Sequence, residues 1–214
     1  MYNRFFKRFI DLVLSSIGIV IAAIPMLIVA VLIKADSPGP VFFRQKRVGI
    51  NKTHFMIMKF RSMPVTAPKD TPTHELKDAS SLLSPFQEAI RKYSIDELPQ
   101  LFNIFAGQMS FVGPRPALWN QYDLLEERDK YGANGVKPGL TGWAQINGRD
   151  ELPIAVKAAY DGEYVKNLSF AFDVKCFFRT FFAVAKAEGV TEGGTGSMES
   201  AGASSDNGSS QNGK

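Results

Sequence analysis

Two adjacent acidic residues, Asp96 and Glu97, are the first candidates for chemistry in this chain. They lie in the string SIDELPQ at 94–100, just before a segment with helical spacing of apolar residues. A carboxylate at a helix N-terminus lies in a positive field that keeps it ionised. An ionised aspartate can serve as a nucleophile or as a magnesium ligand. The pair therefore indicates a catalytic or metal-binding site.

The same residues could instead be helix caps. Ser94 followed three residues later by Glu97 forms a capping-box pattern, and Asp96 could itself be the cap. Pro99 fits better with Asp96 as the cap, because its missing N–H then falls at the third helical position, where no intrahelical bond is needed. Capping and catalysis are compatible, so the spacing leaves both open.

Basic and amide side chains are available to bind an anionic substrate near this pair. Arg115 lies between two prolines, which fix its backbone, and an arginine held in this way suits bidentate binding of phosphate. Taken singly, each other cation could be a solvated surface charge. The glycine-rich segment 137–149 adds backbone N–H groups and amides that suit a nucleotide or a sugar. The candidate binding residues are Lys59, Arg61, Arg91, Arg115, Gln145, Asn147 and Arg149.

Several other chemistries are disfavoured. The chain of 214 residues has only two histidines, too few for a usual zinc cluster or a serine–histidine–aspartate arrangement. No phosphate-binding P-loop and no dinucleotide-binding glycine pattern is present. The single cysteine, Cys176, excludes a disulfide framework and fits a reducing compartment. Its aromatic neighbours favour a packed core thiol over a reactive one.

The elements that must position these residues form a mainly helical α+β fold with a small β-hairpin. Strands are predicted at 41–45 and 53–60, and helices at 84–93, 98–105, 120–130 and 170–188. Leu98, Leu101, Phe102 and Phe105 are expected to share one face. Segment 136–149 is predicted to be an ordered loop. We expect a membrane segment at 1–35, a catalytic domain at 36–190 and a disordered tail at 191–214.

An uncharged apolar run at 12–33 carries Pro25 near its centre and has cations on both sides. Its 22 residues would form a helix of about 33 Å, long enough to cross a bilayer. Cationic flanks favour the cytoplasmic side, and here both flanks are cationic. The pattern predicts a re-entrant helix that breaks at Pro25 and returns to the same face. The alternative is a kinked single span.

Charge is distributed unevenly, which bears on the partners. The net charge of the whole chain is +4, whereas residues 1–61 carry +8 and the remainder −4. A basic front end beside an apolar segment indicates anionic headgroups or phosphate ligands. Nucleic acid is the disfavoured rival, since no nucleic-acid motif accompanies the charge.

Five motifs give the chain a resemblance to the bacterial sugar transferases, the small monotopic phosphoglycosyl transferases. They are SPGPVF at 37–42, KFRSM at 59–63, DELPQ at 96–100, FVGPRP at 111–116 and GLTGWAQINGR at 139–149. The chain departs from the family in having Ile24 rather than serine before Pro25, and Gln87-Glu88 where a Gly-Arg pair is common.

The resemblance implies a specific activity. Similar proteins move a phosphosugar from a UDP-sugar onto polyprenol (undecaprenyl) phosphate, releasing UMP and beginning assembly of a surface glycan. It implies that Asp96 is the nucleophile and a magnesium ligand, that Glu97 is its dyad partner, and that Mg²⁺ is the cofactor. It also implies the cytosolic face of the bacterial inner membrane. The motifs leave open the sugar, the oligomeric state, and whether Glu97 is a base or only positions metal and substrate. The rival from another class is a non-enzymatic membrane module that binds phospholipids.

Overall fold

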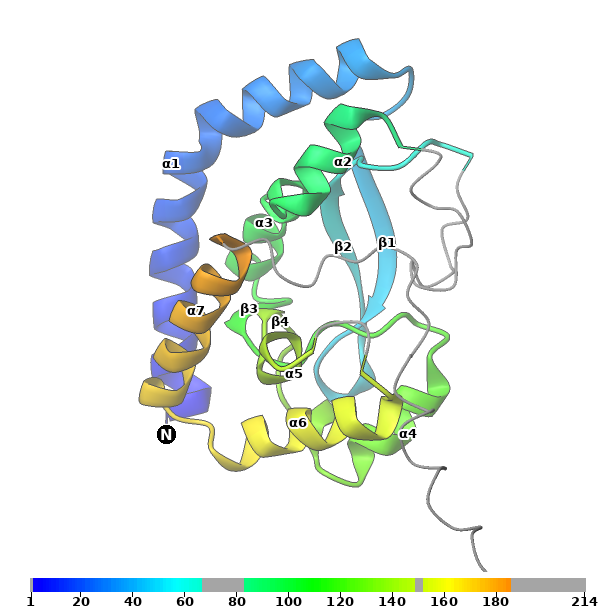
Figure 1. Cartoon of the computed structure of the whole chain (residues 1–214). Coiled ribbons are helices and arrows are strands. Elements are labelled where there is room, and N and C mark those ends of the chain that lie inside the picture. The colour runs from blue at the N-terminus through cyan, green and yellow to red at the C-terminus, as the bar shows by residue number, and fades with distance from the viewer. Residues whose placement is uncertain (1, 67–82, 149–151, 186–214) are drawn as a thin grey trace, which may run out of the picture.

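The computed structural model describes residues 2–66, 83–148 and 152–185, and these form a mostly helical fold with two small sheets (Figure 1). The α-helices are α1 (Lys7–Asp36), α2 (Pro85–Lys92), α3 (Gln100–Phe105), α4 (Tyr122–Asp129), α5 (Trp143–Ile146), α6 (Ile154–Lys166) and α7 (Phe170–Ala185). Single turns are η1 (Tyr2–Phe6), η2 (Ile50–Lys52), η5 (Ile95–Glu97) and η6 (Ala133–Gly135). The strands are β1 (Phe42–Val48), β2 (His54–Phe60), β3 (Ser110–Val112) and β4 (Gly139–Thr141). The predicted class, mainly helical with a β-hairpin, is confirmed.

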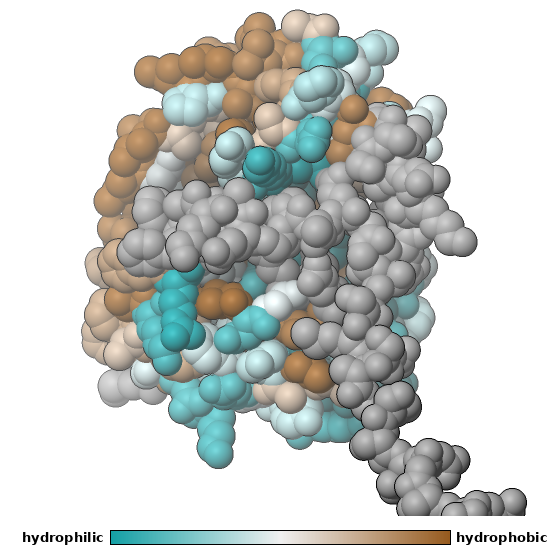
Figure 2. Space-filling model, viewed as in Figure 1, coloured by the Kyte–Doolittle hydropathy of each residue, from teal (hydrophilic) through white to brown (hydrophobic). Residues whose placement is uncertain are grey.

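Helix α1 has a broad apolar surface exposed on its outer side. Val20, Ile21 and Ile24 are each more than 70% exposed, and Figure 2 shows an apolar surface along the edge where Figure 1 places α1. Pro25 lies inside the helix, and Figure 1 shows α1 bending partway along. Proline removes a backbone hydrogen bond and is a usual cause of such a bend. Among the described residues, α1 is the one helix long and apolar enough to cross a membrane.

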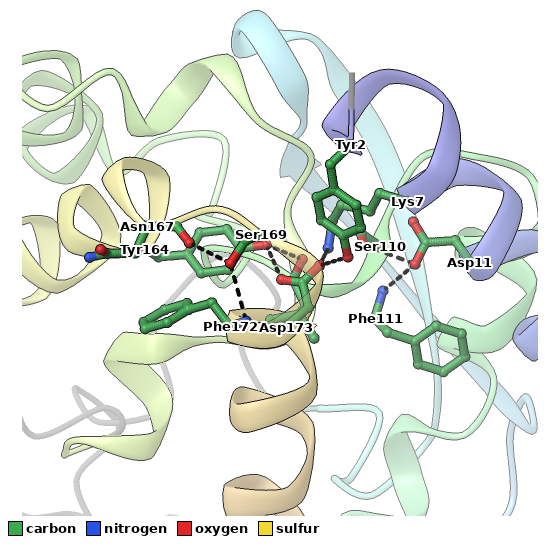
Figure 3. Close-up of polar contacts among 11 residues, drawn as sticks. Tyr2, Lys7, Asp11, Ser110, Phe111, Tyr164, Asn167, Ser169, Phe172 and Asp173 are labelled. Carbon is green, nitrogen blue, oxygen red and sulfur yellow. Dashed lines mark hydrogen bonds and ion pairs between the residues drawn. The ribbon is translucent and has the colours of Figure 1, made fainter.

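A buried polar network fixes the beginning of α1 to β3 and α7 (Figure 3). The Lys7 Nζ donates to Asp173 Oδ2 at 2.5 Å, and the Tyr164 hydroxyl donates to Asp173 Oδ1 at 2.8 Å. The Asp11 Oδ1 accepts a hydrogen bond from the Ser110 hydroxyl at 3.0 Å. Buried charges are tolerated when they are paired and hydrogen-bonded in this way. The first turns of α1 are therefore held against the globular part.

The predicted hairpin is present as β1 and β2, which pair antiparallel from Phe42 opposite Phe60 to Val48 opposite His54. Side chains alternate between the two faces of a strand. Phe55 and Ile57 consequently point to the same face, where they join a buried cluster with residues of α3. This packing brings the end of β2 beside η5.

The predicted apolar face of the helix at 98–105 is partly wrong. Phe102 and Phe105 are 39% and 47% exposed, and the apolar residues that α3 buries are Leu101 and Ile104. The helix is shorter than predicted, and its buried side also includes polar side chains that bond to neighbouring strands. Asn103, for example, donates to the carbonyl of Met56 at 2.8 Å.

Segment 136–149 contains regular structure that the sequence did not predict. Its β4 pairs in parallel with β3, and its α5 follows directly. The glycines permit close backbone packing: a Cβ on Gly139 would lie 2.2 Å from the backbone nitrogen of Gly113. The ordered character that was predicted is correct, but this part is a strand and a helix rather than a loop.

The C-terminal helices complete a second core. Cys176 is fully buried and packs in a cluster with Val112, Trp143 and Tyr164, and burial raises the pKa of its thiol to about 12. A packed thiol is therefore confirmed. Phe170 and Phe178 of α7 are each 56% exposed, so the phenylalanines of this helix are not all core. The predicted tail at 191–214 lies outside the described residues.

Candidate active site

Asp96 and Glu97 lie in η5, between α2 and α3. Ser94 leads the chain into this turn with a φ of 55°, in the left-handed region. An N-cap residue needs an extended backbone, and in this part of the described chain neither η5 nor α3 has a side-chain cap. The prediction that Ser94 or Asp96 is a helix cap is therefore wrong, and the Asp96 carboxylate is left for another role.

Glu97 is held between two cations. The Lys59 Nζ lies 2.6 Å from Glu97 Oε1, and the Arg115 Nη2 lies 3.3 Å from the same oxygen. Burial by itself raises the pKa of Glu97, but Lys59 and Arg115 outweigh it and lower that pKa to about 2. Glu97 is therefore ionised at neutral pH and brings the two cations together beside Asp96.

Asp96 has the opposite electrostatic character. Its side chain is buried and accepts a hydrogen bond from the Ser62 hydroxyl at 3.3 Å. Burial is the largest effect and the negative charge of Glu97 adds to it, while Lys59 opposes both, so the pKa of Asp96 is raised to about 6. The charges of Arg91 and Arg115 also act to lower this pKa. Two neighbouring carboxyls with pKa values pushed in opposite directions are typical of acid–base or nucleophilic sites.

Arg115 is positioned by its backbone. The backbone nitrogen of Gly139 donates to the carbonyl of Pro114 at 2.9 Å, which attaches β4 to the segment before Arg115. The Arg128 Nη2 donates to the carbonyl of Arg115 at 3.0 Å and also pairs with the buried Asp161 at 2.7 Å. The sequence reasoning missed Arg128 and Asp161. They are 33 residues apart, and no local pattern could pair them.

Arg61 lies elsewhere. Its guanidinium is buried and donates to the backbone carbonyls of Pro38 and Ser37, each at 2.6 Å. Ser37 is the C-cap of α1, and Pro38 is the next residue. Arg61 was predicted to bind substrate, and that prediction did not include these contacts with Ser37 and Pro38.

The amides predicted to bind substrate contact their own segment. The Gln145 Nε2 donates to the carbonyl of Leu140 at 3.3 Å, and the Asn147 Nδ2 donates to the carbonyl of Trp143 at 2.8 Å. Gln145 Oε1 is buried without a partner in the described part of the chain. Arg149 lies outside the described residues. The structure thus brings Lys59 and Arg115 into direct contact with Glu97, and the charge of Arg91 acts on Asp96.

The described residues contain no cluster of three or more acidic, histidine or cysteine side chains that could by itself hold a metal ion. Mg²⁺ nevertheless fits this site, because it is commonly bound through one or two carboxylates, substrate phosphates and water. Glu97 is engaged by two cations, whereas the carboxylate of Asp96 accepts a long hydrogen bond from the Ser62 hydroxyl at 3.3 Å. Asp96 is the residue suited to such a metal.

Comparison with known proteins assigns the chain to a family. Residues 2–187 match the family model described as bacterial sugar transferase. The uncharacterized sugar transferase EpsL of Bacillus subtilis is 38% identical over 186 residues, which cover 87% of this chain and 90% of that protein.

Longer relatives carry names of defined activity. The UDP-glucose:undecaprenyl-phosphate glucose-1-phosphate transferase of Escherichia coli is 38% identical over 84% of this chain, which spans 40% of that protein. The UDP-N-acetylgalactosamine-undecaprenyl-phosphate N-acetylgalactosaminephosphotransferase of Aeromonas hydrophila is also 38% identical, over 82% of this chain and 43% of its own length. The chain thus spans about two fifths of the length of these two relatives.

Proposed function

The chain belongs to the bacterial sugar transferase family, and on that premise we propose that it transfers a sugar-1-phosphate from a UDP-sugar to undecaprenyl phosphate, releasing UMP. It is a phosphoglycosyl transferase. The observation that carries the proposed reaction is Asp96, buried and bonded to Ser62, beside a glutamate that gathers Lys59 and Arg115. This reaction begins assembly of a surface glycan, in agreement with relatives named for exopolysaccharide production.

In the first step, an Asp96 carboxylate oxygen attacks the phosphorus that bears the sugar. A bond forms between that oxygen and phosphorus, the bond from phosphorus to the UMP oxygen breaks, and UMP leaves with the electron pair. The nucleophile approaches an anionic diphosphate, so cations must offset the accumulating charge. Lys59 and Arg115 are close enough to Glu97 to be held for this task.

In the second step, a phosphate oxygen of undecaprenyl phosphate attacks the phosphosugar on Asp96. The bond from phosphorus to the aspartyl oxygen breaks, which restores the carboxylate and leaves the sugar on a lipid diphosphate. Glu97 is a weak base because its pKa is held at about 2. Its role in this scheme is to orient Lys59 and Arg115 rather than to take a proton.

Mg²⁺ is part of this proposal as the cofactor. Asp96 would hold the ion together with the donor diphosphate, and when bound the ion neutralises charge on the phosphates. Arg91, Gln145, Asn147 and Arg149 stay predicted substrate contacts.

The test of the function is release of UMP from a panel of UDP-sugars in the presence and absence of undecaprenyl phosphate. The relatives are named for glucose and for N-acetylgalactosamine, so both donors belong in the panel. A covalent intermediate predicts parallel double-reciprocal lines when the donor is varied at several fixed acceptor concentrations. Intersecting lines would instead indicate direct transfer in a ternary complex. A phospholipid-binding module would release no UMP from any donor.

We further propose that α1 is re-entrant and that the catalytic part lies on the cytosolic face of the inner membrane. The ion pair between Lys7 and Asp173 fixes the beginning of α1. The hydrogen bond from Arg61 to the Ser37 carbonyl fixes its end. Both ends therefore contact the same globular part, while the outer side chains between them are apolar and exposed. A span with its ends on opposite sides would have to break one of these attachments.

Cysteine labelling tests this topology. In a Cys176→Ser background that keeps transfer activity, Asn3→Cys and Thr53→Cys should both react with a membrane-impermeant reagent from the cytosolic side alone. The reason is that cations flank both ends of the apolar run and resist translocation. Reaction of residue 3 only from outside and residue 53 only from within would establish a true span.

A further inference from the structure

The side chain of Arg61 is committed to the end of α1. Its Nη1 donates to the Pro38 carbonyl at 2.6 Å, and its Nη2 donates to the carbonyl and hydroxyl oxygens of Ser37 at 2.6 and 2.9 Å. A longer contact of 3.3 Å reaches the carbonyl of Ile33. Ser37 is the C-cap of α1, and Pro38 is the residue after it. Arg61, which is only 4% exposed, therefore supplies donors to the cap of α1 and to the turn that follows it.

The turn that follows α1 is shaped around this guanidinium. Gly39 has a φ of +126°, and a Cβ built there would lie 2.0 Å from Arg61 Nη1. Glycine is the residue that tolerates both this φ and this approach. A second contact joins α2 to the same end of α1, because Gln87 Nε2 donates to Asp36 Oδ2 at 3.0 Å.

The backbone of Arg61 belongs to the catalytic part. Its nitrogen donates to the Val41 carbonyl at 2.8 Å, which continues the hairpin one residue beyond β2. Lys59, two residues before, pairs with Glu97, and Ser62, the next residue, bonds to Asp96. The side chain and the backbone of one residue thus join the apolar helix to the strand end that contacts both acidic residues.

We propose that Arg61 is a positioning residue, which fixes the end of α1 to the catalytic part and so sets the height of Asp96 relative to the lipid-borne acceptor. The inference rests on the proposed function. The pairing of Lys59 with Glu97 does not depend on the Arg61 side chain, because Lys59 lies in β2 and is placed by the hairpin. Loss of the guanidinium contacts should therefore impair the step that uses the membrane-embedded acceptor and spare the step that uses the soluble donor.

The experiment separates these two steps with the full chain in vesicles that contain undecaprenyl phosphate. Exchange of labelled UMP into UDP-sugar reports the donor step, and formation of lipid-linked sugar reports the whole reaction. Arg61→Lys keeps the charge but loses the planar fork. We expect lipid transfer to fall by about 10- to 100-fold, with a raised KM for undecaprenyl phosphate, and exchange to stay within about twofold of wild type.

Two further variants sharpen the test. Gly39→Ala displaces the guanidinium without altering Arg61 and should give the same split. Lys34→Met is the matched control, because the Lys34 Nζ donates to the Gly39 carbonyl at 2.8 Å from an exposed position, and surface contacts of this kind contribute little. Its transfer and exchange should both match wild type. A short-chain polyprenol phosphate that is soluble in water should restore transfer in Arg61→Lys, since the height of the site no longer matters.

Other outcomes would overturn the inference. Equal loss of exchange and transfer in Arg61→Lys would make Arg61 a donor-binding residue or a determinant of the fold. Unchanged lipid transfer in both Arg61→Lys and Gly39→Ala would show that the contact has no positioning role. Absence of both exchange and transfer in the wild-type chain would refute the proposed function itself.

Discussion

An Asp96→Asn variant should lose transfer activity by a factor of about 1,000 or more. The substitution keeps the size of the side chain and an oxygen that can accept the Ser62 hydroxyl, but it removes the nucleophilic carboxylate. Both UMP exchange and lipid transfer should disappear together, because each requires the bond between Asp96 and phosphorus. Rates of both reactions with several UDP-sugars measure this effect.

Stability provides the control for Asp96→Asn. The pKa of Asp96 is raised in the fold to about 6, so the folded state binds its proton more tightly than the unfolded state, and this residue's contribution to stability falls as pH rises from about 4 to about 6. Asparagine does not ionise, so the variant does not lose stability in this way as pH rises. The Tm of the variant at pH 7 should therefore equal or exceed that of wild type. Substantial activity in this well-folded variant would remove Asp96 from the chemistry.

A Glu97→Gln variant should lose about 100-fold or more in kcat/KM for the donor. The substitution leaves Lys59 and Arg115 near each other without the carboxylate that pairs with both. Removing one partner of a buried charge cluster is destabilising, so the Tm should fall, in contrast to Asp96→Asn. Activity close to wild type would show that Lys59 and Arg115 are organised by other contacts.

The pH profile of the residual Glu97→Gln activity gives a second readout. In wild type, donor-step activity should rise with pH through about 6, as the Asp96 carboxyl becomes ionised. The negative charge of Glu97 is one of the causes that raise this pKa. Removing it should move the acid limb of the profile to lower pH. An acid limb that stays in place would contradict the coupling of the two carboxyls.

Local features of the fold were predictable because nearby residues decide them. The helix predicted at 84–93 is present as α2, where Ser84 and Gln87 form a capping box and Pro85 is the first helical residue. The content of β-branched and aromatic residues predicted the hairpin, which differs from its predicted bounds by at most three residues. The string SIDE at 94–97 misled at the same level, because the backbone of Ser94 is left-handed and its side chain makes no cap bond.

The sequence by itself determined the acidic pair, the cations available to it, and an apolar segment interrupted by proline, since these are properties of residue type and spacing. Only the tertiary structure decided that Lys59 and Arg115 meet at Glu97 while Arg61 turns to the end of α1. It also decided that β4 pairs in parallel with β3 and fixes the backbone beside Arg115. These contacts join residues 18 to 38 positions apart. Their partners are chosen by packing and by the need of buried polar groups for hydrogen bonds, which no local pattern records.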